Sequence, residues 1–212
     1  YAFDKETFNI INPNFNLEGL DLFKFNEKSF SLSRGYTKLD RKIKSLDIYF
    51  RYSPYNNLWN STQRWKRIIP NIDKKTLISV CLLSLKNSIL NFCKDENIKI
   101  SIHLISDNSS DEFDQKIMNL VKSDNFKSYL YKSKIEGNRG SYLECCDQAE
   151  KAEDLIFFVE DDYLFENVCI DEMLSTYSRV SSLIKDDIIL CPSDYPFYYD
   201  TLYSTSIHIG KD

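Results

Sequence analysis

Several patterns that mark common protein classes are missing from this sequence. It has no run of about 18 consecutive apolar residues, so no segment is long enough to cross a membrane as a helix. None of the six cysteines belongs to a CxxC pair, and neither histidine stands at zinc-finger spacing. A zinc site is therefore not expected. Buried, reduced thiols in a cytoplasmic protein are the simplest interpretation of the cysteines.

Acidic residues outnumber basic residues, with 32 Asp and Glu against 27 Lys and Arg. The net charge is −5 and the pI is near 5.2, which argues against a general nucleic-acid surface or a surface for acidic membranes. Any phosphate binding would have to be local, through a metal ion or a few placed cations. Hydrophobic residues make up 42% of the 212 residues, which is enough for a packed core in one large α/β domain or two small ones.

The order of the expected elements favours an α/β fold with a mainly parallel central sheet and helices on both faces. Residues 1–45 show no sustained period, and we expect them to form an extension that packs on the main domain, residues 46–212. In the main domain, expected strands alternate with expected helices. The strands are expected at 46–51, 98–105, 127–131, 155–159 and 187–191, and the helices at 74–93, 112–122, 141–152 and 170–183.

Two of these strands differ in their hydrophobic pattern. Residues 98–105 alternate apolar and polar side chains, which predicts a half-buried strand nearer the edge of the sheet. Residues 155–159 form a continuous apolar run, which predicts a strand buried on both faces of a parallel sheet. This second strand stops abruptly on three acids, Glu160, Asp161 and Asp162.

Carboxylates thus follow two expected strands, since Asp107 ends the strand at 98–105 and the acidic triplet ends the strand at 155–159. The carboxyl ends of parallel strands lie on one edge of a sheet, so these groups are expected to converge. Convergent carboxylates suit a hard cation such as Mg²⁺ or Mn²⁺. The simpler alternative is a solvated loop in which Asp162 caps a turn. Three acids in a row, with a second acidic strand end, favour a site.

Three motifs, in this order, resemble those of a known enzyme family. They are Asp107 within LISDNSSDEF, the turn GNRGSYLECC, and FFVEDDYLF. Together they resemble the nucleotide-sugar glycosyltransferases with the GT-A fold, and most closely the large family-2-like group. In that group a strand ends in an Asp-containing loop, an N-x-G turn starts a helix, and a strand ends in a D-x-D motif. The resemblance covers residues 46–194 and implies a Rossmann-like nucleotide-diphospho-sugar transferase fold.

The resemblance implies a donor site at these strand ends. Asp107 would hydrogen-bond the nucleobase, and Ser53 and Tyr52 would lie against the same base. Family members often carry an Arg-Asn pair inside the helix after the N-x-G turn, where this chain has two cysteines. Arg139 or Arg51 is expected to supply the missing nucleotide contact.

The acidic triplet corresponds to the D-x-D motif of the family, with Glu160 and Asp162 in its first and third positions. The resemblance implies that Asp162 ligates Mn²⁺ or Mg²⁺ and that Glu160 faces the ribose or a metal-bound water within the same metal site. Asp161 stands in the variable middle position, among the expected contacts of the nucleotide sugar. The metal would bridge the two donor phosphates and stabilise the departing nucleoside diphosphate.

The acceptor side of such an enzyme is the least complete in this chain. Inverting members place a general-base Asp or Glu well beyond the D-x-D strand, and Asp194 is the candidate here. Few residues follow that strand. Either the acceptor half lies outside this chain, or the acceptor site is built differently.

The leading hypothesis is a metal-dependent, inverting glycosyltransferase of hexosyltransferase type, with a glycan, lipid or protein as acceptor. A receiver-like signalling module would need a lysine after the last expected strand, where Pro192 and Ser193 stand. A nucleotidyltransferase would need a glycine-rich, basic loop after the first strand, and RYSPYNN has no glycine. A non-catalytic module that binds a metal or nucleotide is a further alternative.

Overall fold

The computed structural model describes residues 3–4, 22–24, 29–32, 39–55, 72–93 and 98–192. The chain divides into two compact units, one of residues 1–42 with 171–212 and one of residues 43–170. In the first unit, β1 (Phe3–Asp4), β2 (Leu22–Lys24) and β3 (Ser29–Leu32) form an antiparallel sheet in the order β1-β3-β2. The second unit contains the expected nucleotide-binding residues.

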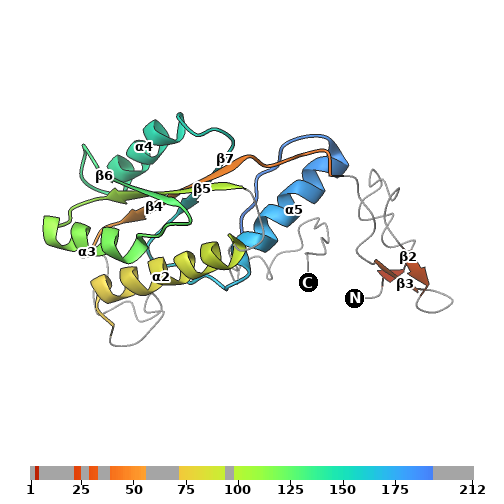
Figure 1. The fold of residues 1–212 in the computed structure, drawn as a ribbon, viewed down its shortest axis with the longest axis horizontal. Helices are drawn as coiled ribbons and strands as arrows, with labels where there is room; N and C mark the ends of the chain where they lie inside the picture. The colour runs from red at the N-terminus through yellow and green to blue at the C-terminus, as the bar shows by residue number, and fades with distance from the viewer. Residues whose placement is uncertain are drawn as a thin grey trace. The chain divides into compact units, whose positions relative to one another are not determined.

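The second unit is built on a four-stranded sheet of β4 (Ser45–Tyr52), β5 (Lys99–Ser106), β6 (Lys127–Lys132) and β7 (Leu155–Val159). All strand pairs are parallel. Three helices connect the strands: α2 (Lys74–Phe92), α3 (Asp111–Val121) and α4 (Asn138–Ala149). Figure 1 shows α2 and α3 on one face of the sheet and α4 on the other. The predicted α/β fold, with a parallel sheet and helices on both faces, is confirmed.

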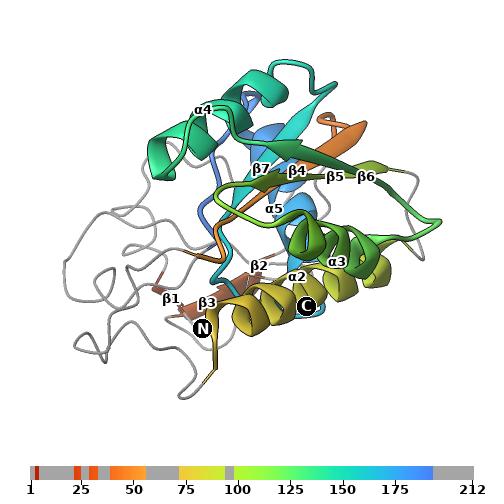
Figure 2. The same cartoon turned by 90° about the vertical axis from the view of Figure 1, so that its left-hand side faces the viewer.

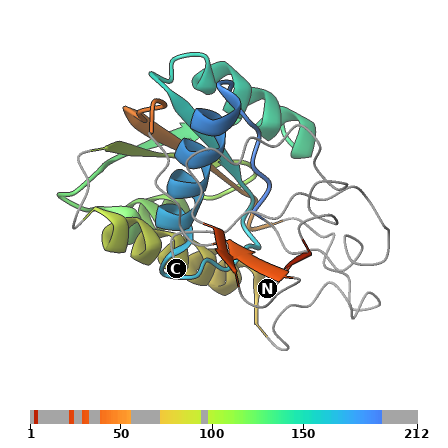
Figure 3. The same ribbon diagram turned by 90° about the vertical axis from the view of Figure 1, so that its right-hand side faces the viewer.

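The strand order β6-β5-β4-β7 creates a point where the direction of winding reverses. From β4 the chain steps to β5 and then to β6, by way of α2 and α3. It then returns by way of α4 to β7, on the other side of β4. Figures 2 and 3 show α2 and α4 on opposite sides of the sheet from two opposite directions. In sheets of this kind, ligands bind beyond the carboxyl ends of the strands at such a switch point, here β4 and β7.

Two predictions about strand position were wrong. The half-buried strand at 98–105 is the interior strand β5, and the apolar run at 155–159 is β7, at the edge of the sheet in the described residues. The outward side chains Ile156 and Phe158 of β7 are 45% and 37% exposed. The polar alternation in β5 is tolerated because His103 Nε2 lies 2.8 Å from Asp47 Oδ1 on β4. The imidazole also stacks on Tyr49, with ring centroids 4.5 Å apart.

The packing of α2 follows its sequence pattern closely. Its buried face consists of side chains at helical spacing, and its N-cap is Asp73, whose side chain accepts from the Thr76 amide. Ile48 and Phe50 of β4 are also fully buried. The apolar residues that bury the face toward the sheet are Leu77, Ile78, Cys81, Leu82, Leu85, Ile89 and Phe92.

The last predicted strand, at 187–191, is not formed: these residues have no regular secondary structure, and Ile189 is 98% exposed. They follow α5 (Cys169–Ile184), which confirms the helix expected at 170–183. Asp187 instead accepts hydrogen bonds from Tyr177, at 2.7 Å, and Arg41, at 3.0 Å. These contacts satisfy Asp187 without a neighbouring strand.

Two further observations bear on the sequence-based expectations. All six cysteines lie within the described residues and none forms a disulfide bond, but only Cys81 and Cys145 are buried, so the expectation of buried thiols was wrong for the other four. Among the helices described, none combines the length and apolar character that crossing a bilayer requires. Asp194, the candidate base, lies outside the described residues.

Candidate functional site

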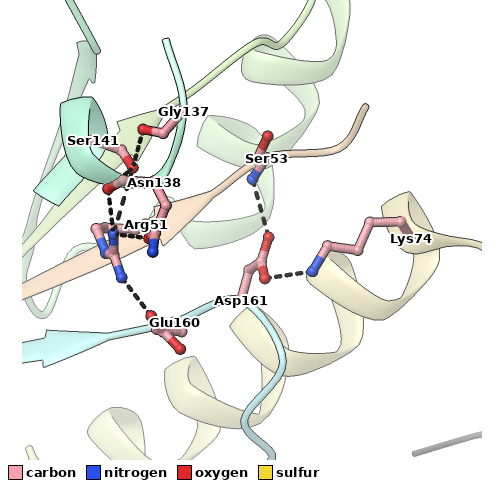
Figure 4. A network of polar contacts seen from close by, with 8 residues as sticks. All are labelled: Arg51, Ser53, Lys74, Gly137, Asn138, Ser141, Glu160 and Asp161. Carbon is pink, nitrogen blue, oxygen red and sulfur yellow. Dashed lines mark hydrogen bonds and ion pairs between the residues drawn. The ribbon is translucent and has the colours of Figure 1, made fainter. Parts of the chain in front are cut away.

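Arg51, near the carboxyl end of β4, joins β7 to the start of α4. Its guanidinium donates to the side-chain and backbone oxygens of Asn138, at 2.8 and 3.1 Å. The other terminal nitrogen forms an ion pair with Glu160. The Arg51 side chain is 12% exposed and that of Glu160 is 53% exposed. A largely buried cation therefore faces a more open carboxylate at the switch point (Figure 4).

Asp161 points the other way, toward α2 (Figure 4). Its Oδ2 accepts from the Ser53 amide at 3.0 Å, and its Oδ1 lies 2.5 Å from Lys74 Nζ. The residue is 9% exposed, and burial raises the pKa of its carboxyl, although Lys74 and the Ser53 amide act in the opposite direction. Asp161 thus connects the ends of β4 and β7 to the first turn of α2.

Asp162 is the member of the triplet that remains available. It is partly buried and, among the described residues, has no hydrogen-bond or ion-pair partner. Glu160 uses only Oε1 in its contact with Arg51. The three consecutive acids therefore occupy three different environments, of which only the first and third can face a ligand.

These side chains can be compared with the requirements of Mg²⁺ or Mn²⁺. No group of three His, Cys, Asp or Glu side chains able to hold a metal ion occurs in the described parts of the chain. A cage made only of protein ligands therefore does not fit. Mg²⁺ is usually held by one or two carboxylates and completed by substrate phosphates and water. Among the described residues, Asp162 and the second oxygen of Glu160 have no hydrogen-bond or ion-pair partner and are the carboxylate groups available for such an arrangement.

Asp107 fixes the start of α4 from the end of β5. Both of its carboxylate oxygens accept from the Gly137 amide, at 3.0 and 3.2 Å. Its own amide donates to the Tyr52 carbonyl, also at 3.0 Å. Asp107 is only 5% exposed. It therefore lies at the predicted edge of the sheet but does not share a cluster with the acidic triplet.

Steric constraints explain why residues 137 and 140 of the GNRG turn are both glycine. Gly137 has φ +93°, a conformation that side-chain-bearing residues rarely adopt. At Gly140, an added Cβ would lie 1.9 Å from the Ile135 carbonyl oxygen. The two glycines allow α4 to begin close to the preceding backbone, and this position brings Asn138 to Arg51.

The other predicted nucleotide contacts, Tyr52, Ser53 and Arg139, lie in different environments. The Tyr52 hydroxyl donates to Asp114 at 2.7 Å in the core, and burial strongly raises the pKa of Tyr52. The Tyr52 side chain is therefore hydrogen-bonded to α3 in the core and does not face the site. Ser53 contacts the site through its backbone amide, which donates to Asp161. Arg139 is exposed at the start of α4 and has no partner among the described residues.

Lys74 and Asn138 contribute to the site but were not predicted from the sequence. Lys74 stands directly after the helix cap Asp73, where a positive charge opposes the helix dipole. A lysine at the start of a helix is locally unfavourable, and this feature of the sequence could have identified Lys74 as a site residue. Asn138 stands within the recognised turn, but only the fold brings it to Arg51. A cavity of about 510 Å³ lies away from these residues, beside α3 and the amino end of β6. Met118, Phe126 and Tyr129 form part of its lining.

No family model, curated protein or solved structure compared with the chain matches it. The functional argument therefore depends on the sheet topology and on the side chains at its switch point. Those side chains are the Arg51 guanidinium and its half-exposed partner Glu160, together with Asp162, which follows two residues later beyond the end of β7.

Proposed function

We propose that the protein is a metal-dependent glycosyltransferase of GT-A type, which moves a sugar from a nucleotide-diphosphate donor to an acceptor. One observation carries the proposal: Arg51 forms an ion pair with Glu160, two residues before the available Asp162, at the topological switch point of a parallel sheet. A cation beside carboxylates suits a phosphate–metal ligand, because the cation contacts phosphate oxygens and the carboxylates hold the metal.

The two available carboxylates have separable roles in this proposal. Asp162 would hold Mn²⁺ or Mg²⁺ directly, and Glu160 would face the same ion. When bound, the metal offsets the negative charge that develops on the departing nucleoside diphosphate. Arg51 would contact the donor phosphates, and Arg139, exposed at the start of α4, is a second candidate contact for them.

The nucleoside is assigned to the neighbouring strand ends. Asp107 retains acceptor capacity, because its carboxylate offers about four lone-pair directions and the Gly137 amide is its partner. We assign the nucleobase to Asp107 and to the backbone around Ser53. Tyr52 supports this region from the core, through Asp114.

The acceptor is a glycan, lipid or protein. In an inverting transfer a base removes the proton from the acceptor hydroxyl as that oxygen bonds to the anomeric carbon, and the bond from this carbon to the diphosphate breaks. Asp194 is the proposed base. We also propose a cytoplasmic location, which six cysteines without a disulfide bond favour.

The experiment that tests this function is a thermal-shift screen of nucleoside diphosphates and nucleotide sugars, with and without Mn²⁺. We expect one nucleotide class to raise the melting temperature only when Mn²⁺ is present. Asp162→Asn should abolish the shift, whereas Asp124→Asn, at an exposed position between α3 and β6, should retain it. No response to any common nucleotide would contradict the proposal. Binding without sugar transfer would instead identify a non-catalytic nucleotide-binding module.

A further inference from the structure

The pair formed by Lys74 and Asp161 connects three elements at the switch point. Lys74 is the first residue of α2, and its Nζ lies 2.5 Å from Asp161 Oδ1. The second oxygen of Asp161 accepts from the Ser53 amide at the end of β4. Both charged side chains are largely buried, at 13% and 12% exposed. The pair therefore lies in a fixed setting, unlike an ordinary surface ion pair.

The position of Lys74 is unfavourable on local grounds. The amino end of a helix carries a partial positive charge, so acidic residues are favoured there and lysine is not. The first turn of α2 contains no acidic residue. Local rules of this kind are most often broken where a site requires it. Asp161 offsets the conflict, because its carboxylate lies against the lysine.

The neighbours of Asp161 are the residues that the proposed function needs. Glu160 is directed to Arg51, and Asp162 is the member of the triplet that has no partner in the described parts of the chain. All three belong to one short stretch of backbone that leaves β7. Any movement of Asp161 therefore moves the two carboxylates on either side of it.

We propose that Lys74 is a positioning residue for the metal–diphosphate site: it holds Asp161 against the end of β4 and so fixes where Glu160 and Asp162 present their carboxylates. The inference rests on the proposed function. Lys74 touches neither the metal nor the diphosphate in this account. It acts through Asp161 and the backbone that follows β7.

The loss of Lys74 has a defined consequence. Asp161 would keep the Ser53 amide but lose the cation on its other oxygen, and a buried carboxylate without its partner is strongly unfavourable. The backbone from Glu160 to Asp162 would then relax. Groups that orient metal ligands typically change metal affinity by about 10- to 100-fold when they are removed. We expect Lys74→Met to weaken Mn²⁺ binding within that range.

The test measures Mn²⁺ binding by the loss of the free-ion EPR signal, with Mn²⁺ alone and with UDP or GDP as probes. The matched control is Lys86→Met. Lys86 is also on α2 and donates to the Leu120 and Lys122 carbonyls at the end of α3, away from the site. Lys86→Met should lower stability but leave the Mn²⁺ affinity unchanged. Lys74→Arg, which keeps the charge, should recover most of the affinity.

A double variant keeps the test decisive if Lys74→Met does not fold. Lys74→Met with Asp161→Asn removes both charges of the pair, so Asp161 is not left as a buried carboxylate without its cation, and the variant should fold with weakened Mn²⁺ binding. Wild-type Mn²⁺ affinity in folded Lys74→Met or in the double variant would overturn the role of Lys74, provided that Asp162→Asn weakens binding. Absence of Mn²⁺ binding to the wild-type protein in the presence of either nucleotide would instead overturn the proposed function.

Discussion

Arg51 and Glu160 form an ion pair across the switch point of the sheet, although 109 positions separate them in the chain. The pair joins the two strands between which the winding reverses. Arg51 also donates to Asn138 at the start of α4. One guanidinium therefore ties together the strand ends and the helix that surround the proposed donor site.

Replacing Arg51 should affect metal and diphosphate binding differently. In Arg51→Met, the affinity for UDP or GDP with Mn²⁺ should fall about 10-fold or more, because a hydrogen bond to a charged group contributes roughly 1.5–3 kcal/mol. Mn²⁺ alone should bind no more weakly, because a neighbouring cation has been removed. Calorimetric titration of both ligands measures the two effects.

The control for Arg51 is Lys99, whose ion pair with Glu153 is exposed, with side chains 76% and 53% accessible. Lys99→Met should change stability by less than about 1 kcal/mol and leave both affinities unchanged. A parallel loss of affinity in the two variants would show that Arg51 has no specific role.

The start of α4 should not tolerate a side chain at Gly140. An added Cβ would meet the Ile135 backbone at 1.9 Å, so Gly140→Ala should reduce the free energy of unfolding by roughly 1–3 kcal/mol. It should also weaken diphosphate binding, because Asn138 would shift from Arg51. Leu143→Ala, at a position 43% exposed on the same helix, is the control in urea unfolding. Equal stability of the two variants would contradict the close approach.

The cap of α2 should show a pH-dependent contribution to stability. The hydroxyl and amide of Thr76 lower the pKa of Asp73 below its ordinary value of 3.8. A lowered pKa in the folded state stabilises the protein above the ordinary pKa, and that stability is lost as the pH falls through the folded-state value. At neutral pH, Asp73→Ala should reduce the free energy of unfolding by about 1 kcal/mol.

The difference between wild type and Asp73→Ala should therefore shrink as the pH falls below about 4, which urea unfolding over that range measures. Thr76→Ala should give a smaller difference with the same trend, because it removes only the hydroxyl that bonds Asp73 Oδ2 at 2.6 Å. A difference that stays constant with pH would contradict the capping interaction.

Asp107 should contribute both to folding and to recognition of the nucleoside. Asp107→Ala leaves the Gly137 amide without its partner, so the free energy of unfolding should fall by about 1–3 kcal/mol. Asp107→Asn keeps one acceptor oxygen and should be more stable than the alanine variant. Both should weaken UDP or GDP binding without changing the affinity for Mn²⁺ alone. An effect on Mn²⁺ alone would place Asp107 in the metal site.

The sequence predicted the fold class well because alternating elements and helical periodicity report directly on local structure. The buried face of α2, from Ile78 to Ile89, is an example. Strand position was harder to predict. An apolar run such as 155–159 has the same appearance at the edge of a sheet as inside it, and the polar alternation of β5 is satisfied by Asp47, which only the fold brings near.

The candidate site was predicted in part. Sequence reasoning identified the triplet and Arg51 but treated the acids as one convergent group with Asp107. In the structure Asp161 is directed to Lys74 and Asp107 to Gly137. Side-chain direction depends on neighbours that are distant in sequence, so spacing alone does not determine which carboxylate remains available.

The most direct test of the account is a calorimetric titration of UDP and GDP into the wild-type protein and Asp162→Asn, each with and without Mn²⁺. The account predicts saturable binding of at least one nucleotide to the wild-type protein only with Mn²⁺. Asp162→Asn should bind at least about 10-fold more weakly while remaining folded. Equal affinity with and without Mn²⁺, or equal affinity of the two proteins, would contradict the metal–diphosphate site at the end of β7.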